Sequence, residues 1–375
     1  MRIFRLGSRD PAVAQVRRWL ADLGQLAPHS GEAPTAFTPS VDKAIRAFQQ
    51  RRGLRVDGVL GPDTYRALEG ARWQLGDRTL HHHVSHPYAG DDVLVLQQRL
   101  SDLGFDVGRF DGHFGTRTDL ALRDFQRNYG LSADGTVGPA TVRALHQLSR
   151  SVKGGRSQEL REAEALRHRG PRLAGKKVVV DPGHGGPETG WAAGNLTERD
   201  IVADLGRRLQ GRLAASGVEA LLTHGADNAP TDVERAAFAN ETDADLLLSL
   251  HVDGSRSRQA NGVATFYYGT GPGTGSVPGE RLAELVQREI VARTDLLDGR
   301  CHPRTWELLR RTRMPAVVVE IGYLTHQGDA RRLADPDLRD TVAEALLVAV
   351  QRLFLPADLD PPTGVLRMSA MSAPG

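Results

Sequence analysis

The stretch VVVDPGHGGPETG, residues 178–190, joins an apolar run to a glycine-rich turn that contains His184. The β-branched run predicts a buried strand, and the glycines allow the backbone to turn tightly directly after it. In an open α/β sheet, ligands bind beyond the carboxyl ends of the strands. We therefore expect this turn to present the His184 imidazole at a binding site.

Strands and helices alternate along the chain on the C-terminal side of this turn. The pattern predicts strands at 176–181, 218–224, 244–251, 262–268 and 315–322, and helices at 198–217, 230–241, 279–294 and 336–354. Such alternation is typical of a mostly parallel sheet that is flanked by helices. The sequence therefore predicts an α/β domain over residues 176–355.

The N-terminal half contains an internal repeat, because residues 37–70 and 114–147 share the pattern F-Q-x-x-x-G-L-x-x-D-G-x-x-G-P-x-T. Apolar residues recur at helical spacing before each copy, and the Asp-Gly and Gly-Pro steps indicate turns. We expect two small all-α three-helix domains, at residues 1–75 and 84–149. Every repeated residue is also compatible with a core or turn role alone.

Three segments do not have the periodicity of a packed core. HHHVSH, residues 81–86, is interpreted as a linker, with a metal site as the alternative. Residues 150–175 are expected to form a second linker, of which SQELREAEALRHRG has the composition of a short bridging helix. Residues 356–375 are rich in proline and small residues and are expected to form a flexible tail.

Composition excludes several classes of protein. The 375 residues are 40% hydrophobic and 25% charged, with a formal net charge of +2, so the balance does not indicate a nucleic-acid binder. A single cysteine, Cys301, excludes an intramolecular disulfide. The start MRIFRLGSRDPAVAQV has no apolar core of signal-peptide length, and no window reaches transmembrane length. We therefore expect a cytoplasmic protein without a transmembrane segment.

Titratable residues follow several of the expected strands. His184 and His251 lie at strand ends, Glu198 opens a helix, and Glu320 ends the apolar run AVVVE. Two imidazoles and a carboxylate with one position open are the ingredients of a catalytic zinc site. Taken singly, a strand-end histidine is also compatible with a hydrogen-bonded scaffold, and Glu198 with the helix dipole. Burial of Glu320 should raise the pKa of its carboxyl group by desolvation.

Residues 176–354 resemble the zinc-dependent N-acetylmuramoyl-L-alanine amidases of the type 3 family. The resemblance rests on VVVDPGHGG, LTERDIVADLGRRL, ERAAFAN, LLLSLHVDG, GVATFYY and LLRRTRMPAVVVEIGYLT, in the order that the family has them. It implies one Zn²⁺ ion held by His184, Glu198 and His251, with Glu320 as the catalytic glutamate. The implied reaction cleaves the lactyl–L-alanine amide of peptidoglycan or its precursors. The two repeats resemble peptidoglycan-binding domains, which implies peptidoglycan fragments or a lipid-linked precursor as partners.

Three positions depart from the family pattern. Asp253 stands where the family commonly has asparagine, and His224 stands where arginine is usual. GRCH, residues 299–302, reorders an Arg-Gly pair and is expected to reshape the substrate groove. None of these departures removes an implied ligand. Cys301 is interpreted as a groove or partly buried thiol, with an extra metal ligand as the alternative.

A second function from a different class stays open. Two repeats before an amidase-type domain, without a signal peptide, resemble actinobacterial regulators of peptidoglycan precursor synthesis. This resemblance implies a cytosolic protein that is controlled by phosphorylation, with weak or no hydrolysis. Thr363, in PPTGV, is the candidate phospho-acceptor in an expected exposed setting. The partners would be a Ser/Thr kinase and a cytosolic precursor-synthesis enzyme.

Overall fold

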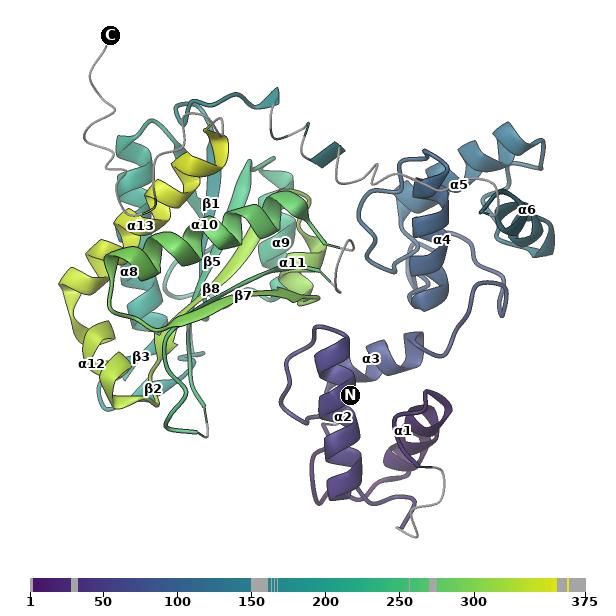
Figure 1. The fold of residues 1–375 in the computed structure, drawn as a ribbon, viewed down its shortest axis with the longest axis horizontal. Coiled ribbons are helices and arrows are strands. Elements are labelled where there is room, and N and C mark those ends of the chain that lie inside the picture. The colour runs from purple at the N-terminus through teal and green to yellow at the C-terminus, as the bar shows by residue number, and fades with distance from the viewer. Residues whose placement is uncertain are drawn as a thin grey trace. The chain divides into compact units, whose positions relative to one another are not determined.

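The computed structural model describes most of the chain. The described residues are 3–27, 33–149, 161–162, 164, 166, 168–255, 257–269, 275–355 and 363. The chain divides into two compact units, Met1–Arg161 and Glu162–Gly375. The first is helical and the second contains a sheet with flanking helices (Figure 1). Most of the expected 150–175 linker and 356–375 tail lies outside the described residues.

The first unit consists of two successive sets of three helices. The first set is α1 (Pro11–Asp22), α2 (Pro39–Arg51) and α3 (Pro62–Gly70), and the second is α4 (Asp91–Asp102), α5 (Thr116–Tyr129) and α6 (Pro139–Ser149). Proline begins four of these helices, since its missing N–H has no partner in a first turn anyway. The predicted all-α three-helix arrangement is therefore confirmed.

Each set of helices has its own apolar core, on the faces that the sequence periodicity predicted. Val16 and Leu20 are fully buried in the first core, and Leu96 and Leu100 are fully buried in the second. The histidines of the 81–86 segment contact one another, with ring centroids 5.9 Å apart for His83 and His86. Among the described residues, however, they do not form a group of metal-ligating geometry.

A buried glutamine fastens each Asp-Gly turn to a helix. The Gln126 amide in α5 donates to Asp134 Oδ1 (3.0 Å) and to the Thr136 carbonyl (3.0 Å), and its Oε1 accepts from Gly135 N–H (2.9 Å). The glutamine side chain therefore hydrogen-bonds both to an N–H group and to oxygen atoms of the turn, and this holds the turn against the helix. We call this arrangement a glutamine anchor.

The same anchor recurs in both sets of helices. Gln49 bonds to Asp57, Gly58 and Val59 in the same way, and Gln97 bonds to Asp111, Gly112 and His113. Arg17 of α1 lies at the fourth corresponding position and reaches the Ala36 carbonyl (3.4 Å). The second set of helices therefore contains two glutamine anchors, whereas the first contains one, with Arg17 at the position that corresponds to Gln97.

The second unit is built on a six-stranded sheet. Its strands are β1 (Lys177–Pro182), β4 (Glu219–Leu222), β5 (Leu246–Asp253), β6 (Val263–Tyr268), β7 (Asp298–Arg304) and β8 (Ala316–Tyr323), in the order β4-β1-β5-β8-β6-β7. The first four strands in this order run parallel, and β6 pairs antiparallel with β8. The predicted mostly parallel sheet is confirmed.

A short hairpin and six helices complete this unit in its described residues. They are β2 (Ala192–Ala193), β3 (Leu196–Thr197), α8 (Glu198–Ala215), α9 (Asp232–Glu241), α10 (Val277–Arg293), α11 (Glu307–Arg311), α12 (Gln327–Ala334) and α13 (Pro336–Phe354), with a few residues near Glu162 in a further helical turn. Figure 1 shows α8, α10 and α13 packed together on the sheet.

Alternation along the strands divides the sheet into two buried faces. Val178 and Val180 of β1 pack in the core with α8, α10 and α13, whereas Val179 packs with α9 and α11. In β8, Val319 belongs to the first face and Val318 to the second. Because side chains alternate with period two, Asp181, His251 and Glu320 all fall on the α9/α11 face.

The strand β7 is a difference from the sequence prediction. DGRCHPR contains no β-branched residue and did not predict a strand, but it pairs with β6 at the sheet edge. Cys301 within it is half-buried and accepts from the Thr265 hydroxyl (3.1 Å). The thiol is therefore partly buried and is not a member of the metal-type cluster. Among the helices in the described part of the chain, none combines the length and the apolar character that a membrane span requires.

Candidate metal centre

The turn after β1 holds His184 in an unusual backbone conformation. Its φ is +63°, in the left-handed region, and it is followed by Gly185 (φ +144°) and Gly186 (φ +50°). Glycine adopts such values without a Cβ penalty, but a histidine does so only at a cost. The DPGHGG sequence therefore makes a chain reversal that directs the His184 side chain over the end of the sheet.

Glu198 lies at the first position of α8 and is only 2% exposed. Its Oε1 accepts the Val252 N–H (3.1 Å) and its Oε2 accepts the Trp191 N–H (3.1 Å). The adjacent Thr197 caps the helix by accepting the Asp200 N–H. The carboxylate is thus fixed by backbone donors on both sides.

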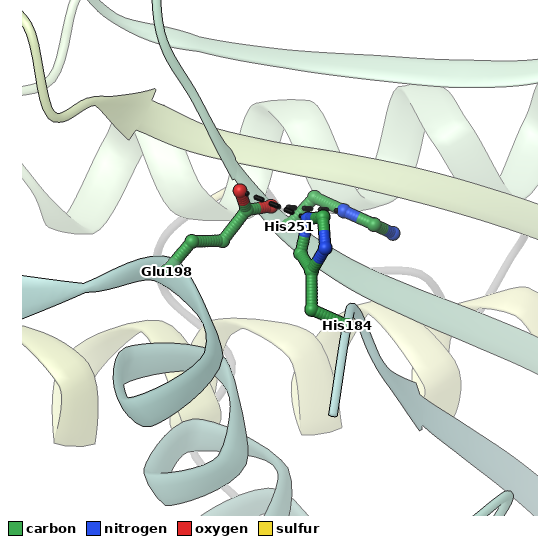
Figure 2. Close-up of side chains that lie close together, drawn as sticks. All are labelled: His184, Glu198 and His251. Atoms are coloured by element: carbon green, nitrogen blue, oxygen red, sulfur yellow. Dashed lines mark hydrogen bonds and ion pairs between the residues drawn. The ribbon is translucent and has the colours of Figure 1, made fainter. Parts of the chain in front are cut away.

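His184, Glu198 and His251 converge at the carboxyl ends of β1 and β5. His184 Nε2 lies 3.0 Å from Glu198 Oε2, and His251 Nδ1 lies 3.0 Å from Glu198 Oε1. One ligand atom from each residue lies within 4.8 Å of the other two. Figure 2 shows the Glu198 side chain directed at both imidazoles, which meet edge-on with ring centroids 5.5 Å apart.

The electrostatics of the cluster are those of a strongly coupled group. Burial would raise the pKa of Glu198, but hydrogen bonds from His184 and His251 lower it to about 2. Burial would likewise lower the pKa of His251, but its hydrogen bond to Glu198 and the charges of Glu320 and Glu198 raise it to about 9. Without a metal, a proton on His251 therefore balances the buried carboxylate.

The cluster has the properties that a metal ion requires. Two imidazole nitrogens and one carboxylate oxygen form a donor set that suits Zn²⁺ and leave room for a further ligand. Among the described residues, the polar contacts of the buried Glu198 carboxylate are with two imidazoles and two backbone N–H groups, not with a lysine or an arginine. Glycine lines the cluster where space is smallest, since a Cβ at Gly183 would lie 2.3 Å from the His251 ring. The residues therefore fit a zinc ion.

Glu320 lies beside the cluster but is not part of the three-residue group. It is 6% exposed in β8 and is the register partner of His251 in β5. Its negative charge contributes to the raised pKa of His251. The structure therefore places all four residues that the sequence singled out at one edge of the sheet.

Two departures from the family pattern have clear positions. Asp253 Oδ1 accepts the Gly254 N–H (2.7 Å), and burial together with the charges of Asp253 and Glu320 raises the pKa of Tyr323 to about 12. Asp253 is thus placed toward Tyr323 and is not one of the clustered ligands. His224 contacts the backbone of His184, as its Nε2 lies 2.6 Å from the His184 carbonyl oxygen.

Sequence reasoning missed the buried network beneath the turn. Asp181 is fully buried and accepts from Arg235 Nη1, Ser249 Oγ and Thr223 Oγ1, each at 2.6 Å. The sequence does contain a signal for this network, because Asp181 ends an apolar run as Glu320 does. A carboxylate that is buried in such a run needs a hydrogen-bonding or charged partner.

Thr363 differs from its expected exposed setting. The residue is half-buried, and Arg352 Nη1 donates to its hydroxyl at 3.4 Å. Arg352 is itself 3% exposed and forms an ion pair with the buried Glu289. Thr363 is therefore less exposed than the sequence predicted.

Known proteins resemble the chain over nearly its whole length. The N-acetylmuramoyl-L-alanine amidase family matches residues 178–352, and a peptidoglycan binding domain matches residues 9–68 and 89–145. The chain is 47% identical over 380 residues to the N-acetylmuramoyl-L-alanine amidase CwlM of Mycobacterium tuberculosis, covering 98% of this chain and 94% of that protein.

More distant relatives match about half of the chain. The amidase LytC of Bacillus subtilis is 30% identical over 174 residues, which is 46% of this chain and 34% of LytC. The solved structure of the amidase AmiC2 of Nostoc punctiforme is 31% identical, with a TM-score of 0.44, and covers 47% of this chain and 96% of that one. On the match to CwlM across both units, the chain belongs to the N-acetylmuramoyl-L-alanine amidase family.

Proposed function

We propose that the protein is a zinc-dependent amidase that cleaves the lactyl–L-alanine amide between N-acetylmuramic acid and the stem peptide. The observation that carries this proposal is the convergence of His184, Glu198 and His251, with Glu320 on the neighbouring strand. Three ligands leave a position open for chemistry, as in catalytic rather than structural zinc sites. Family membership supports the choice of an amide bond.

In this proposal, His184, Glu198 and His251 hold the ion. Bound zinc supplies Lewis-acid polarisation of the scissile carbonyl and lowers the pKa of water toward ~7. The Glu320 carboxylate accepts a proton from the attacking water and then delivers it to the amide nitrogen of L-alanine. Glu320 suits this role because it lies beside His251 without being held in the ligand group. The substrates are peptidoglycan fragments or a lipid-linked precursor, with the helical repeats as binding modules.

The decisive experiment measures release of the stem peptide from a purified muropeptide by the metal-loaded protein. Glu320→Gln should lower turnover by about 10²- to 10⁴-fold, the usual contribution of general acid–base catalysis, while zinc content stays at one ion per chain. His251→Ala should remove both zinc and activity. A wild-type protein that binds zinc but releases no stem peptide from any muramyl peptide would reject the enzyme.

A second candidate function is a cytoplasmic, phosphorylation-controlled regulator of peptidoglycan precursor synthesis. The contact between Arg352 and Thr363 favours it, because a phosphate on Thr363 would add nearly two negative charges beside a guanidinium. Such a phosphate would compete with Glu289 for Arg352. A Ser/Thr kinase and a cytosolic precursor-synthesis enzyme would be the partners, and hydrolysis would be weak or absent.

The regulator is tested by combining two substitutions. Thr363→Ala should weaken binding of the kinase-treated protein to the precursor-synthesis enzyme, and Glu320→Gln should leave that binding unchanged. Growth of cells that depend on the Glu320→Gln protein would favour the regulator over the enzyme. Binding that is equally strong with and without Thr363 would count against control at this site.

A further inference from the structure

We propose that His224 is a positioning residue that holds His184 in its metal-binding conformation by donating a hydrogen bond to the His184 carbonyl. The inference rests on the proposed zinc site and deepens it. His224 does not ligate in this arrangement, since the ligand group consists of His184, Glu198 and His251. It acts on the backbone of one ligand.

The conformation that needs holding is the left-handed backbone of His184. For residues with a Cβ, the left-handed region is sparsely populated and disfavoured relative to the helical and extended regions. A turn that relaxed to either of those regions would rotate the Cα–Cβ bond and move the imidazole away from Glu198. The ligand geometry therefore depends on contacts that stabilise φ of +63° at this residue.

Two side chains supply these contacts at the same atom. The His184 carbonyl oxygen lies 2.6 Å from His224 Nε2 and 3.0 Å from Arg235 Nη2. A carbonyl oxygen only accepts, so His224 Nε2 carries the hydrogen in this contact. Two donors occupy both lone pairs of the oxygen, which fixes the orientation of the peptide plane that follows His184.

The position of His224 is in turn fixed from the other side of its ring. Thr223 Oγ1 lies 2.9 Å from His224 Nδ1 and 2.6 Å from Asp181 Oδ1. Asp181 also binds Arg235, which donates to the Pro182 carbonyl at 2.8 Å. Both donors to the His184 carbonyl, His224 and Arg235, are therefore supported by the buried Asp181 carboxylate, His224 through Thr223 and Arg235 directly.

The glycine turn that follows His184 packs closely against the segment that carries His224. A Cβ at Gly185 would lie 2.0 Å from the Asn228 carbonyl oxygen and 2.8 Å from His224 Nε2. Gly186 N–H also donates to the Ala226 carbonyl (2.9 Å). The segment after β4 thus packs directly against the ligand turn, and His224 is the side chain through which it reaches the His184 carbonyl.

His224 is a better test of this idea than Arg235. Arg235 also pairs with the fully buried Asp181, so its removal would leave an unpaired buried charge and destabilise the whole unit. Within the described residues, His224 forms its hydrogen bonds with the His184 carbonyl and with its own neighbour Thr223. A change at His224 therefore separates ligand positioning from general stability.

The experiment compares His224→Gln with His224→Asn in the full chain. The amide nitrogen of glutamine reaches the place of Nε2, whereas that of asparagine reaches only the place of Nδ1. Zinc affinity is measured by competition with a chelator, and the thermal stability of the metal-free protein is measured in parallel. Loss of a hydrogen bond that supports a metal ligand lowers metal affinity by about 10- to 100-fold. We therefore expect zinc affinity to fall by this factor in His224→Asn and to stay close to the wild-type value in His224→Gln.

His302→Leu is the matched control, because His302 also bonds to a backbone carbonyl, that of Gly299 (2.7 Å), but lies in β7. It should leave zinc affinity unchanged. Thr223→Val is the second variant and should weaken zinc binding in the same direction, through loss of support for the ring. Equal affinities for asparagine, glutamine and wild type would overturn the positioning role, as would a fall in metal-free stability without loss of affinity. A wild-type protein that binds no zinc would instead overturn the proposed metal site, and this inference with it.

Discussion

His251 and Glu320 are register partners on the adjacent parallel strands β5 and β8. Partners in a parallel ladder project to the same face of the sheet, and here that is the α9/α11 face. One strand therefore presents a ligand and its neighbour presents a carboxylate beside that ligand. In the proposed mechanism, the metal ligand His251 and the proton-transferring Glu320 are therefore separated by a single interstrand spacing.

Zinc affinity is expected to rise with pH in the neutral to weakly alkaline range. The folded pKa of His251 is raised from 6.5 to about 9, so a proton occupies this ligand below pH 9 and must leave before zinc binds. Glu198, with a pKa of about 2, stays ionised throughout. Linkage of one proton predicts about a tenfold gain in affinity per pH unit between roughly pH 7 and 8.5.

The metal-free protein should show the opposite trend. A raised folded pKa adds stability that is complete below pH 6.5 and is lost as pH rises through about 9. Titration with zinc in a chelator buffer and unfolding of the metal-free protein at the same pH values check both trends. An affinity that does not change with pH would contradict the assignment of the bound proton to His251.

Gly190→Ala is expected to abolish zinc binding. Gly190 has φ +65°, and a Cβ there would lie 2.4 Å from Glu198 Oε2 and 2.7 Å from the His184 ring. Gly194→Ala is the matched control, because Gly194 has φ +59° but nothing within 4 Å of the added carbon. Both variants carry a backbone cost of about 1–2 kcal/mol. Only Gly190→Ala should lose the metal, measured as bound zinc per chain; equal zinc content in both would show that the cluster adapts.

Asp181→Asn is expected to destabilise the second unit strongly. Its carboxylate is fully buried and pairs with Arg235, so neutralising it leaves an uncompensated guanidinium, at about 3–5 kcal/mol. Asp295→Asn removes an exposed pair with Arg332 and should cost less than about 1 kcal/mol. Denaturant unfolding of the metal-free chains measures both changes, and similar values for the two variants would refute the buried pair as a stabilising element.

Gln97→Leu is expected to destabilise the second set of helices. The substitution leaves the buried Gly112 N–H without its partner, at about 1–3 kcal/mol, and removes one of the hydrogen bonds to the half-buried Asp111 carboxylate. Gln98→Leu changes the adjacent, half-buried residue and should stay within about 0.5 kcal/mol of wild type. Hydrogen exchange of the α4 and α5 amides measures the effect; an equal response to both substitutions would remove the special role of the anchor.

The sequence was sufficient to predict five of the six strands of the sheet and the approximate position of the candidate site. Parallel strands place their carboxyl ends at one edge, so the sequence alone predicts that His184 and His251 converge. The strand β7 could not be predicted, because DGRCHPR is placed by pairing with β6 rather than by its own propensity. The contact between His224 and His184 also depends on tertiary structure, since it requires the left-handed turn and β4 together.

The glutamine anchors determine what the helical unit can offer to a ligand. Gly58, Gly112 and Gly135 each direct their N–H inward to a glutamine oxygen. Carbonyls of the same turns are also committed inward, to the glutamine amides. The three glycine N–H groups are therefore not available to glycan hydroxyls. Donation of hydrogen bonds to a sugar chain at these turns would fall to the outward side chains, which differ from one turn to the next.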